Sequence, residues 1–432
     1  MKMTSISRKT CRLLGCCHLL KQEKTVTHNS HLSFTQRRLR HEGWGEVREE
    51  KQGPQKSCPT QKSSPNNNLL LQLLNLNKQM VNNKDPFYVM DHFMNNILYE
   101  DENMVAFNKP MGLPLTYNPP KSLRNSDMTE PVVNLDGLLP ELAKRLFCSK
   151  LYVSLPVDRM CSGVIILTKS EKYNQYLRKR FFSLKVTDQL PYQHWEVLCV
   201  GIPDKLSKEK EKLYYSKEKY KDIYLPQTVF CKPSKNDRKK GQVYSTTLCG
   251  EVIGRNEEKG VRSSHVRVSV TSATNHVIPA YLSERFAPVL GDQEYFWRAV
   301  TVGRQNVMIL KQIPSAGIPR PQELSKGILQ NLEINQGHVQ NLPPFLHRSA
   351  VDIVHLKKAK KEPFTIQTPL PDFFLVTKYR LLRDQRSRTE FSERFSYVSK
   401  KAGPSKEERN SDKVNTEGWE GNLTERNEKI LE

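Results

Sequence analysis

The sequence predicts an α+β protein, because segments typical of strands and segments typical of helices both occur along the chain. Residues 164–167 form an apolar run that is β-branched at three of its four positions and too short for a typical helix. Residues 193–200 and 265–270 alternate between apolar and polar side chains, as strands with one buried face do. Residues 132–147 carry leucines at helical spacing, so helices accompany the strands.

Turn and cap signals connect these elements. In residues 96–115 two strand-like segments flank a polar turn, which predicts a hairpin that ends at Lys109 and Pro110. Ser170 is a predicted N-cap, and the helix that follows it has an apolar stripe that we read as core rather than as a base-stacking surface. Residues 342–347 and 364–374 are predicted to be further apolar strands or loops.

Composition limits the class of protein. Of 432 residues only 37% are hydrophobic, and the mean hydropathy is −0.64, so polar segments outside the core must accompany one folded region. Lys and Arg number 68 against 46 Asp and Glu, a formal net charge of +22. Such an excess attracts polyanions, which makes nucleic acid the leading partner class. The alternative explanation for the excess of Lys and Arg is that it keeps the protein soluble or reflects the basic composition of proteins in an organelle.

The cysteines indicate a reducing compartment. Nine are scattered along the chain without a CxxC pair or a Cys/His cluster at zinc-ligand spacing. Their odd number and irregular spacing argue against a disulfide framework and against a structural zinc site. No apolar run approaches the length of a membrane span.

The N-terminal residues resemble a mitochondrial transit peptide, which we predict to span residues 1–40. The first 22 residues contain five Lys and Arg, several Ser and Thr, and no acidic residue. A basic disordered tail is the alternative. Residues 41–84 are predicted to be a disordered, low-complexity linker, although the leucines between residues 66 and 83 also fit a short amphipathic helix.

The folded region is therefore predicted to span residues 85–380. Residues 381–432 are mostly charged and polar, which predicts a disordered tail. Within the folded region, the Lys-rich insertion at residues 205–221 is predicted to be solvated. The sequence does not decide whether this insertion binds nucleic acid.

Asp158 is the candidate catalytic carboxylate. It lies in a turn directly before the strand at residues 164–167, with Ser162 and Gly163 as small residues at the exit. A group in this place is held by rigid backbone, as a catalytic group must be. A purely structural turn aspartate is the alternative, since Asp favours turns by bonding its own backbone.

Five segments stand out by their order and spacing. They are YEDENMVAFNKPMGLP at 99–114, VDRMCSGVIILTKS at 157–170, HWEVLCVGIP at 194–203, PVLGDQEYF at 288–296, and a closing segment that combines LPPFLHRSAVDIVH and FTIQTPLPDFF. Together they resemble the RluA-like pseudouridine synthases. The resemblance covers residues 97–374. Together with the N-terminal residues, it is greatest to the mitochondrial members of that family.

The resemblance implies a fold and a chemistry. The expected fold is the pseudouridine synthase fold, a mixed and largely antiparallel sheet with flanking helices and a central RNA-binding cleft. The family isomerises uridine to pseudouridine in RNA without a metal or a cofactor. Asp158 matches its nucleophile, Trp195 stands where a tyrosine stacks on the base, and Arg159 and Lys109 are expected to contact the substrate.

The chain departs from the family's motifs at three places in this site. Pro156 stands where the family has an arginine two residues before the nucleophile, and Trp195 replaces the tyrosine. Ile278 stands where a strand of the family carries an arginine that pairs with the catalytic Asp. Arg285 would substitute for that arginine if its loop folds back toward Asp158.

Two functions remain open at this point. The first is an active pseudouridine synthase of the mitochondrial matrix that acts on messenger or ribosomal RNA and supports mitochondrial translation. The second is a catalytically impaired relative that binds RNA or assists mitoribosome assembly, with RNA granule or ribosome assembly proteins as partners. A tRNA or cytosolic enzyme with an accidental basic N-terminus is a third possibility.

Overall fold

The structure of the chain is a computed structural model. It describes residues 68–83, 85–116, 133–220, 223–230, 233–239, 243–302, 305–308, 321–354, 363–383, 387–392 and 394–395. The predicted transit peptide at residues 1–40, residues 41–67 of the predicted linker, and residues 396–432 of the predicted tail lie outside the described residues.

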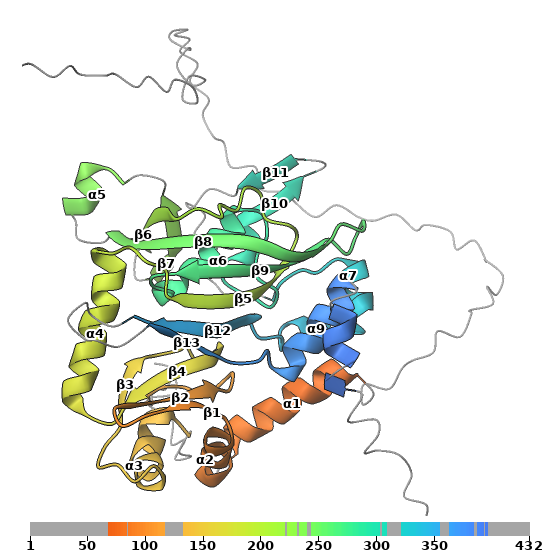
Figure 1. Ribbon diagram of the computed structural model, residues 1–432. Coiled ribbons are helices and arrows are strands. Elements are labelled where there is room, and N and C mark those ends of the chain that lie inside the picture. Colours follow the sequence, from red (N-terminus) through yellow and green to blue (C-terminus); the bar gives the residue numbers. More distant parts are fainter. Residues whose placement is uncertain are drawn as a thin grey trace, which may run out of the picture. The chain divides into compact units, whose positions relative to one another are not determined.

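Eleven strands of the described chain form one sheet in the order β1-β2-β4-β12-β5-β9-β8-β6-β7, with β3 paired to β4 and β13 paired to β12 (Figure 1). Their bounds are β1 (Ile97–Glu100), β2 (Met104–Lys109), β3 (Tyr152–Leu155), β4 (Ser162–Thr168), β5 (Gln193–Val200), β6 (Glu211–Tyr220), β7 (Ile223–Phe230), β8 (Val243–Asn256), β9 (Ser263–Val270), β12 (Leu346–Ile353) and β13 (Phe364–Gln367). Strand β12 runs parallel to β4, and the other pairings are antiparallel. A separate hairpin joins β10 (Ala299–Val302) and β11 (Gln305–Met308).

Helices flank this sheet (Figure 1). They are α1 (Leu69–Asn82), α2 (Pro86–Asn95), α3 (Leu135–Arg145), α4 (Glu171–Val186), α5 (Lys235–Lys239), α6 (Val277–Glu284), α7 (Lys326–Leu332), α8 (Gln336–Val339) and α9 (Asp372–Leu382). Helix α4 packs on β3 and β4, α9 packs on β8 and β9, and α6 packs against β7. The predicted α+β class, with a mixed and largely antiparallel sheet and flanking helices, is confirmed.

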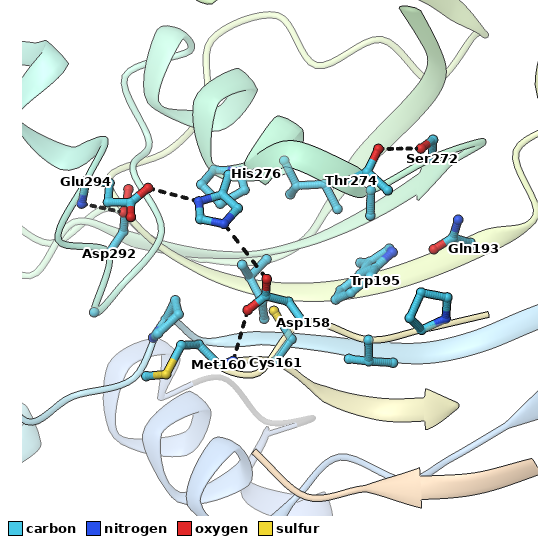
Figure 2. Close-up of a pocket in the computed structure, with 18 of the residues that line it drawn as sticks. Asp158, Met160, Cys161, Gln193, Trp195, Ser272, Thr274, His276, Asp292 and Glu294 are labelled. Carbon is cyan, nitrogen blue, oxygen red and sulfur yellow. Dashed lines mark hydrogen bonds and ion pairs between the residues drawn. The ribbon is translucent and has the colours of Figure 1, made fainter. Parts of the chain in front are cut away.

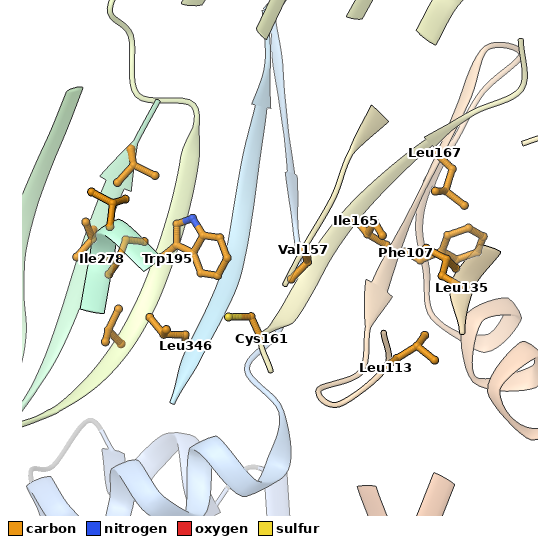
Figure 3. Close-up of a cluster of buried hydrophobic side chains, with 14 of the residues drawn as sticks. Phe107, Leu113, Leu135, Val157, Cys161, Ile165, Leu167, Trp195, Ile278 and Leu346 are labelled. Carbon is orange, nitrogen blue, oxygen red and sulfur yellow. The ribbon is translucent and has the colours of Figure 1, made fainter. Parts of the chain in front are cut away.

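Strand β4 is buried on both faces, which explains its continuous apolar sequence. Ile165 and Leu167 belong to a large cluster that also holds Trp195 and Ile278 (Figure 3). Val164 and Ile166 face the opposite side of the strand and pack under α4. A strand with two buried faces reads as an apolar run rather than as an alternating pattern.

Several predicted elements are confirmed. The hairpin in residues 96–115 is β1 and β2, the strand at residues 193–200 is β5, and the leucine-rich helix is α3. Ser170 caps α4, since its hydroxyl accepts a hydrogen bond from the backbone N–H of Tyr173. The stripe of α4 packs in the core, as expected, with Leu177 and Phe181 buried.

Four predictions differ from the structure. The linker is predicted to reach residue 84, yet residues 69–82 form α1, which confirms the amphipathic helix that the leucines also fit; Asn68 caps it, and Leu70, Leu74 and Val81 are buried. The disordered tail is predicted to begin at residue 381, yet α9 continues to Leu382 and the ring of Phe391 stacks on Tyr379. Most of the insertion expected to be solvated forms β6, in which Leu213 and Tyr215 are buried. The closing segment contains β13, as one expected alternative, but continues into helix α9.

Gly163 permits β4 and β12 to meet directly after the Asp158 turn. It pairs with Arg348 of β12 and has a φ of +116°, which side-chain-bearing residues rarely adopt. A Cβ atom at this position would overlap the backbone carbonyl oxygen of Arg348. Glycine is therefore required where the two strands join.

We expect Gly163→Ala to lower the free energy of unfolding by about 3 kcal/mol or more, because the new methyl group displaces β12 and adopts a strained backbone conformation. Gly260→Ala is the matched control. Gly260 has a φ of +85°, but nothing lies within 4 Å of the place that a methyl group would take, so only the backbone cost of about 1–2 kcal/mol applies. Urea unfolding of both variants measures the difference, and equal losses would show that no clash occurs.

Candidate active site

One cavity of about 600 Å³ opens beside Asp158 (Figure 2). Its walls come from the segment after β3, from β5, from α6 and the residues before it, and from the turn at residues 291–294. The volume lies in the range of small-ligand sites. None of the described residues that line it is Lys or Arg. Those that line it are Leu115, Leu155, Pro156, Val157, Asp158, Met160, Cys161, Tyr192, Gln193, Trp195, Ser272, Ala273, Thr274, His276, Ile278, Pro279, Gly291, Asp292, Gln293, Glu294, Leu342, Pro344 and Leu346.

Asp158 lies at the cavity wall with its side chain 53% exposed. Its Oδ1 accepts a hydrogen bond from the backbone N–H of Met160 at 3.0 Å. The same turn closes through the backbone N–H of Cys161, which donates to the Asp158 carbonyl oxygen at 3.2 Å. One carboxylate oxygen is therefore fixed by the turn while the group stays accessible to a bound molecule.

Lys109 fixes the Asp158 turn by hydrogen bonds to its carbonyl oxygens. Its side chain is completely buried, and Nζ donates to the carbonyl oxygens of Pro110, Asp158, Arg159 and Cys161 at 2.9–3.3 Å. Burial lowers the pKa of Lys109 to about 7, and the negative charge of Asp158 opposes that shift. The expectation that Lys109 contacts the substrate is wrong, because the ammonium group is enclosed by backbone carbonyls.

Arg348 holds the segment before and after the same turn. The buried guanidinium of this β12 residue donates to the carbonyl oxygens of Leu155, Pro156 and Val164, and to Oε1 of Gln193, at distances of 2.5–3.1 Å. Burial lowers the pKa of Arg348 to about 9, so it keeps its charge at neutral pH. Two buried basic side chains, Lys109 and Arg348, thus fix the backbone on both sides of Asp158.

Trp195 lies on β5 and lines the same cavity as Asp158 (Figure 2). The side chain is 4% exposed, and the guanidinium of Arg348 lies 5.7 Å from the ring centroid. The Trp195 Nε1–H is buried and has no hydrogen-bond partner in the described part of the chain. The structure therefore brings together the two residues that the motifs singled out most clearly.

The wall opposite Asp158 differs from the expected strand. Residues 275–278 form the end of a 3₁₀ turn and the start of α6, and Ile278 is buried at the cavity wall. His276 lies between two carboxylates: Nδ1 is 2.9 Å from Glu294 Oε2, and Nε2 is 3.9 Å from Asp158 Oδ2. Within the described residues, this imidazole is the basic group within 4 Å of the Asp158 carboxylate.

The other arginines considered from the sequence lie elsewhere. Arg159 is exposed, and its Nε donates to the carbonyl oxygen of Gly112 at 3.2 Å, outside the cavity lining. Arg285 does not fold back toward Asp158. It pairs with Glu211 at 3.5 Å and lies 4.9 Å from the ring centroid of Tyr281, so that suggestion is wrong.

Sequence reasoning missed three residues that shape this site. His276 and Glu294 meet only because α6 and the turn at residues 291–294 face the same cavity. Arg348 follows His347 in a segment predicted to be a strand. Its charge inside that segment was the one available signal, because native proteins bury a charged group only when it is hydrogen-bonded.

Among the residues that the structure describes, no group of three or more His, Cys, Asp or Glu is arranged to hold a metal ion. In the same ranges no helix has both the length and the apolarity that a membrane span needs.

The order of the motifs and the cavity beside Asp158 resemble those expected of a pseudouridine synthase. No family model matches the chain. The human mitochondrial pseudouridylate synthase RPUSD4 is 24% identical over 306 residues, which cover 66% of this chain and 68% of that protein. The human mitochondrial mRNA pseudouridine synthase RPUSD3 is 25% identical over 276 residues, which cover 63% of this chain and 72% of that protein. These relatives confirm the resemblance: the chain is similar in sequence to mitochondrial pseudouridine synthases.

A solved structure of human RNA pseudouridylate synthase domain containing 4 was also matched. It has 19% sequence identity and a TM-score of 0.47, over 72% of this chain and 98% of that chain.

We expect Lys109→Met to lower the free energy of unfolding by about 3 kcal/mol, because four carbonyl oxygens lose their donor inside the protein. Lys144→Met is the matched control. Lys144 pairs with Glu141 at 3.1 Å on the surface, with 76% of its side chain exposed, and such a pair contributes less than about 1 kcal/mol. Chemical unfolding measures both variants, and a Lys109→Met protein as stable as the control would contradict the bracing role.

Proposed function

We propose that the chain isomerises uridine to pseudouridine in mitochondrial RNA, and that its target is a messenger or ribosomal RNA whose modification supports mitochondrial translation. The observation that carries this proposal is the convergence of Asp158 and Trp195 in one cavity. An accessible carboxylate on a rigid turn, beside an aromatic ring in a largely apolar cavity, suits attack on a nucleotide. The homology to mitochondrial pseudouridine synthases supports the same activity.

Asp158 acts as the nucleophile in this proposal. Its carboxylate attacks the flipped nucleotide, the bond between N1 of uracil and the ribose breaks, and the detached base turns. The base then bonds to the ribose through C5 and releases the Asp158 carboxylate. C5 loses its hydrogen as a proton and N1 takes up a proton, so the product is an isomer of uridine. The reaction needs an ionised, rigidly placed carboxylate and a cavity that retains the detached base and excludes water.

Trp195 supports the base in the cavity. The indole presents an apolar face for stacking and a buried N–H without a partner in the described residues. The uracil must first leave its stack in the RNA, which costs a few kcal/mol. Contacts between the RNA phosphates and basic surface residues offset this cost, and exposed Arg159 next to the nucleophile is our candidate for one such contact.

A second function has one observation in its favour. In the described residues no guanidinium lies within salt-bridge distance of Asp158, and the positions expected to carry arginine hold Pro156 and Ile278. A chain that keeps the cavity but lacks efficient chemistry would bind RNA or assist mitoribosome assembly. RNA granule and ribosome assembly proteins are the proposed partners in that case.

We expect Asp158→Asn to reduce pseudouridine formation at least about 10³-fold, because the amide keeps the shape but is not a nucleophile. The measurement is release of tritium from mitochondrial transcripts labelled at C5 of uridine, together with RNA affinity. Asp136→Asn, at an exposed position on α3, is the control. If cells that carry Asp158→Asn lose no pseudouridine and keep normal translation, the RNA-binding function holds instead.

We expect residues 1–40 to direct a fused fluorescent reporter into the mitochondrial matrix. Five basic residues and no acidic residue precede Glu23, which is the charge pattern that import into this organelle favours. Replacing Arg8, Lys9 and Arg12 by Gln is the matched control and should leave the reporter in the cytosol. A nuclear or cytosolic reporter with the native residues would contradict the proposed location.

A further inference from the structure

His276 lies between Asp158 and a second carboxylate that the mechanism above does not use. Its Nδ1 is 2.9 Å from Oε2 of Glu294, and its Nε2 points toward Oδ2 of Asp158 at 3.9 Å (Figure 2). One nitrogen is thus tied to Glu294, and the other faces the proposed nucleophile. The imidazole side chain is 47% exposed, so a molecule in the cavity reaches it.

The backbone holds His276 in this place. It has a φ of 55° at the junction between the 3₁₀ turn Thr274–His276 and α6, a conformation that is uncommon for a residue with a side chain. The ring also contacts Tyr295 edge-on, with centroids 6.2 Å apart. An uncommon backbone conformation that persists beside a reactive group is a feature of functional sites.

Glu294 is itself fixed by the turn that carries it. Its backbone N–H donates to Oδ1 of Asp292 at 2.9 Å, and Asp292 is buried at the base of the turn. Gly291, with a φ of +79°, leads into this turn. The two elements that meet in the His276–Glu294 contact are therefore both rigid.

The charges around the ring favour its protonated form. The hydrogen bond to Glu294 is the main cause that raises the pKa of His276, burial opposes it, and the charges of Glu294, Asp158 and Asp292 add to the increase. His276 in turn is the main cause that lowers the pKa of Glu294, and Arg298 acts in the same direction. Burial raises the pKa of Asp292 to about 6.

We propose that His276, held as an imidazolium by Glu294, is the positioning residue that supplies the positive charge for Asp158 in the proposed uridine site. The inference rests on the proposed function. His276 lies at the same cavity wall as Ile278, whose side chain carries no charge. His276 acts through Asp158 rather than on the reacting atoms. The charge beside the nucleophile is therefore one that titrates, whereas a guanidinium would be permanent.

This assignment predicts an alkaline decline of the reaction. Below the raised pKa of His276 the imidazolium is present and Asp158 has its partner. As pH rises through that pKa the partner loses its charge, so kcat falls while KM changes little, because RNA binding does not depend on this pair. A residue that only supported the fold would give no such pH profile.

The first experiment compares the pH profile of tritium release from C5-labelled mitochondrial transcripts in four proteins. The wild type should decline on the alkaline side, and Glu294→Gln should move that decline about one pH unit toward acid, because the imidazolium loses its carboxylate partner. His276→Arg should remove the decline. Exposed Glu323→Gln, outside the cavity lining, is the matched control and should follow the wild type.

The second experiment does not need activity. Nuclear magnetic resonance follows the His276 imidazole during a pH titration of the full chain, and both Asp158→Asn and Glu294→Gln should lower its pKa while Glu323→Gln should not. An unchanged His276 titration in Asp158→Asn overturns the inference, as do coincident pH profiles of the wild type and Glu294→Gln. Those results leave the proposed function intact if Asp158→Asn is still inactive. Absence of tritium release from the wild type at every pH overturns the proposed function and, with it, the inference.

Discussion

The site depends on the way two buried basic side chains hold the backbone around Asp158. Lys109 binds carbonyl oxygens within the turn, and Arg348 binds those of the segments that enter and leave it. Neither side chain has a carboxylate partner within 4 Å in the described residues, so peptide carbonyls and the side-chain oxygen of Gln193 accept their hydrogen bonds. Burial of this kind is costly unless every donor is used. The cost is offset by many hydrogen bonds to one short segment, which leaves that segment little freedom.

This arrangement also determines which parts of the chain must meet. Lys109 ends β2, the Asp158 turn precedes β4, and Arg348 lies on β12, so the parallel contact of β4 with β12 sets the position of Asp158. The glycine at position 163 is needed for the same contact. Trp195 lies opposite Arg348 in the neighbouring strand β5, which places the ring over the guanidinium and at the cavity. The register of the sheet thereby brings four segments that are distant in the sequence together around Asp158.

The sequence predicts the elements of the fold better than their contacts. Apolar periodicity finds β4, β5 and α3 because each buries a regular face, and the motif order finds Asp158 and Trp195. Periodicity fails for β6, whose buried Leu213 and Tyr215 are interspersed with charged residues, and for α1 it leaves a helix and low-complexity sequence as alternatives. A substrate contact is the natural expectation for Lys109, because lysine is usually exposed. Its burial follows from tertiary packing, which no local pattern records.

The substitutions in the site become understandable once position and charge are treated as separate requirements. A single arginine near the nucleophile, as the resemblance leads one to expect, would both orient the carboxylate and balance its charge. Here the backbone bonds of Lys109 and Arg348 already fix the turn, so the group beside Asp158 need supply only charge. An imidazole between two carboxylates meets that smaller requirement at 3.9 Å without a direct hydrogen bond to Asp158. Ile278 is then free to be apolar, because the site no longer needs a guanidinium at that position.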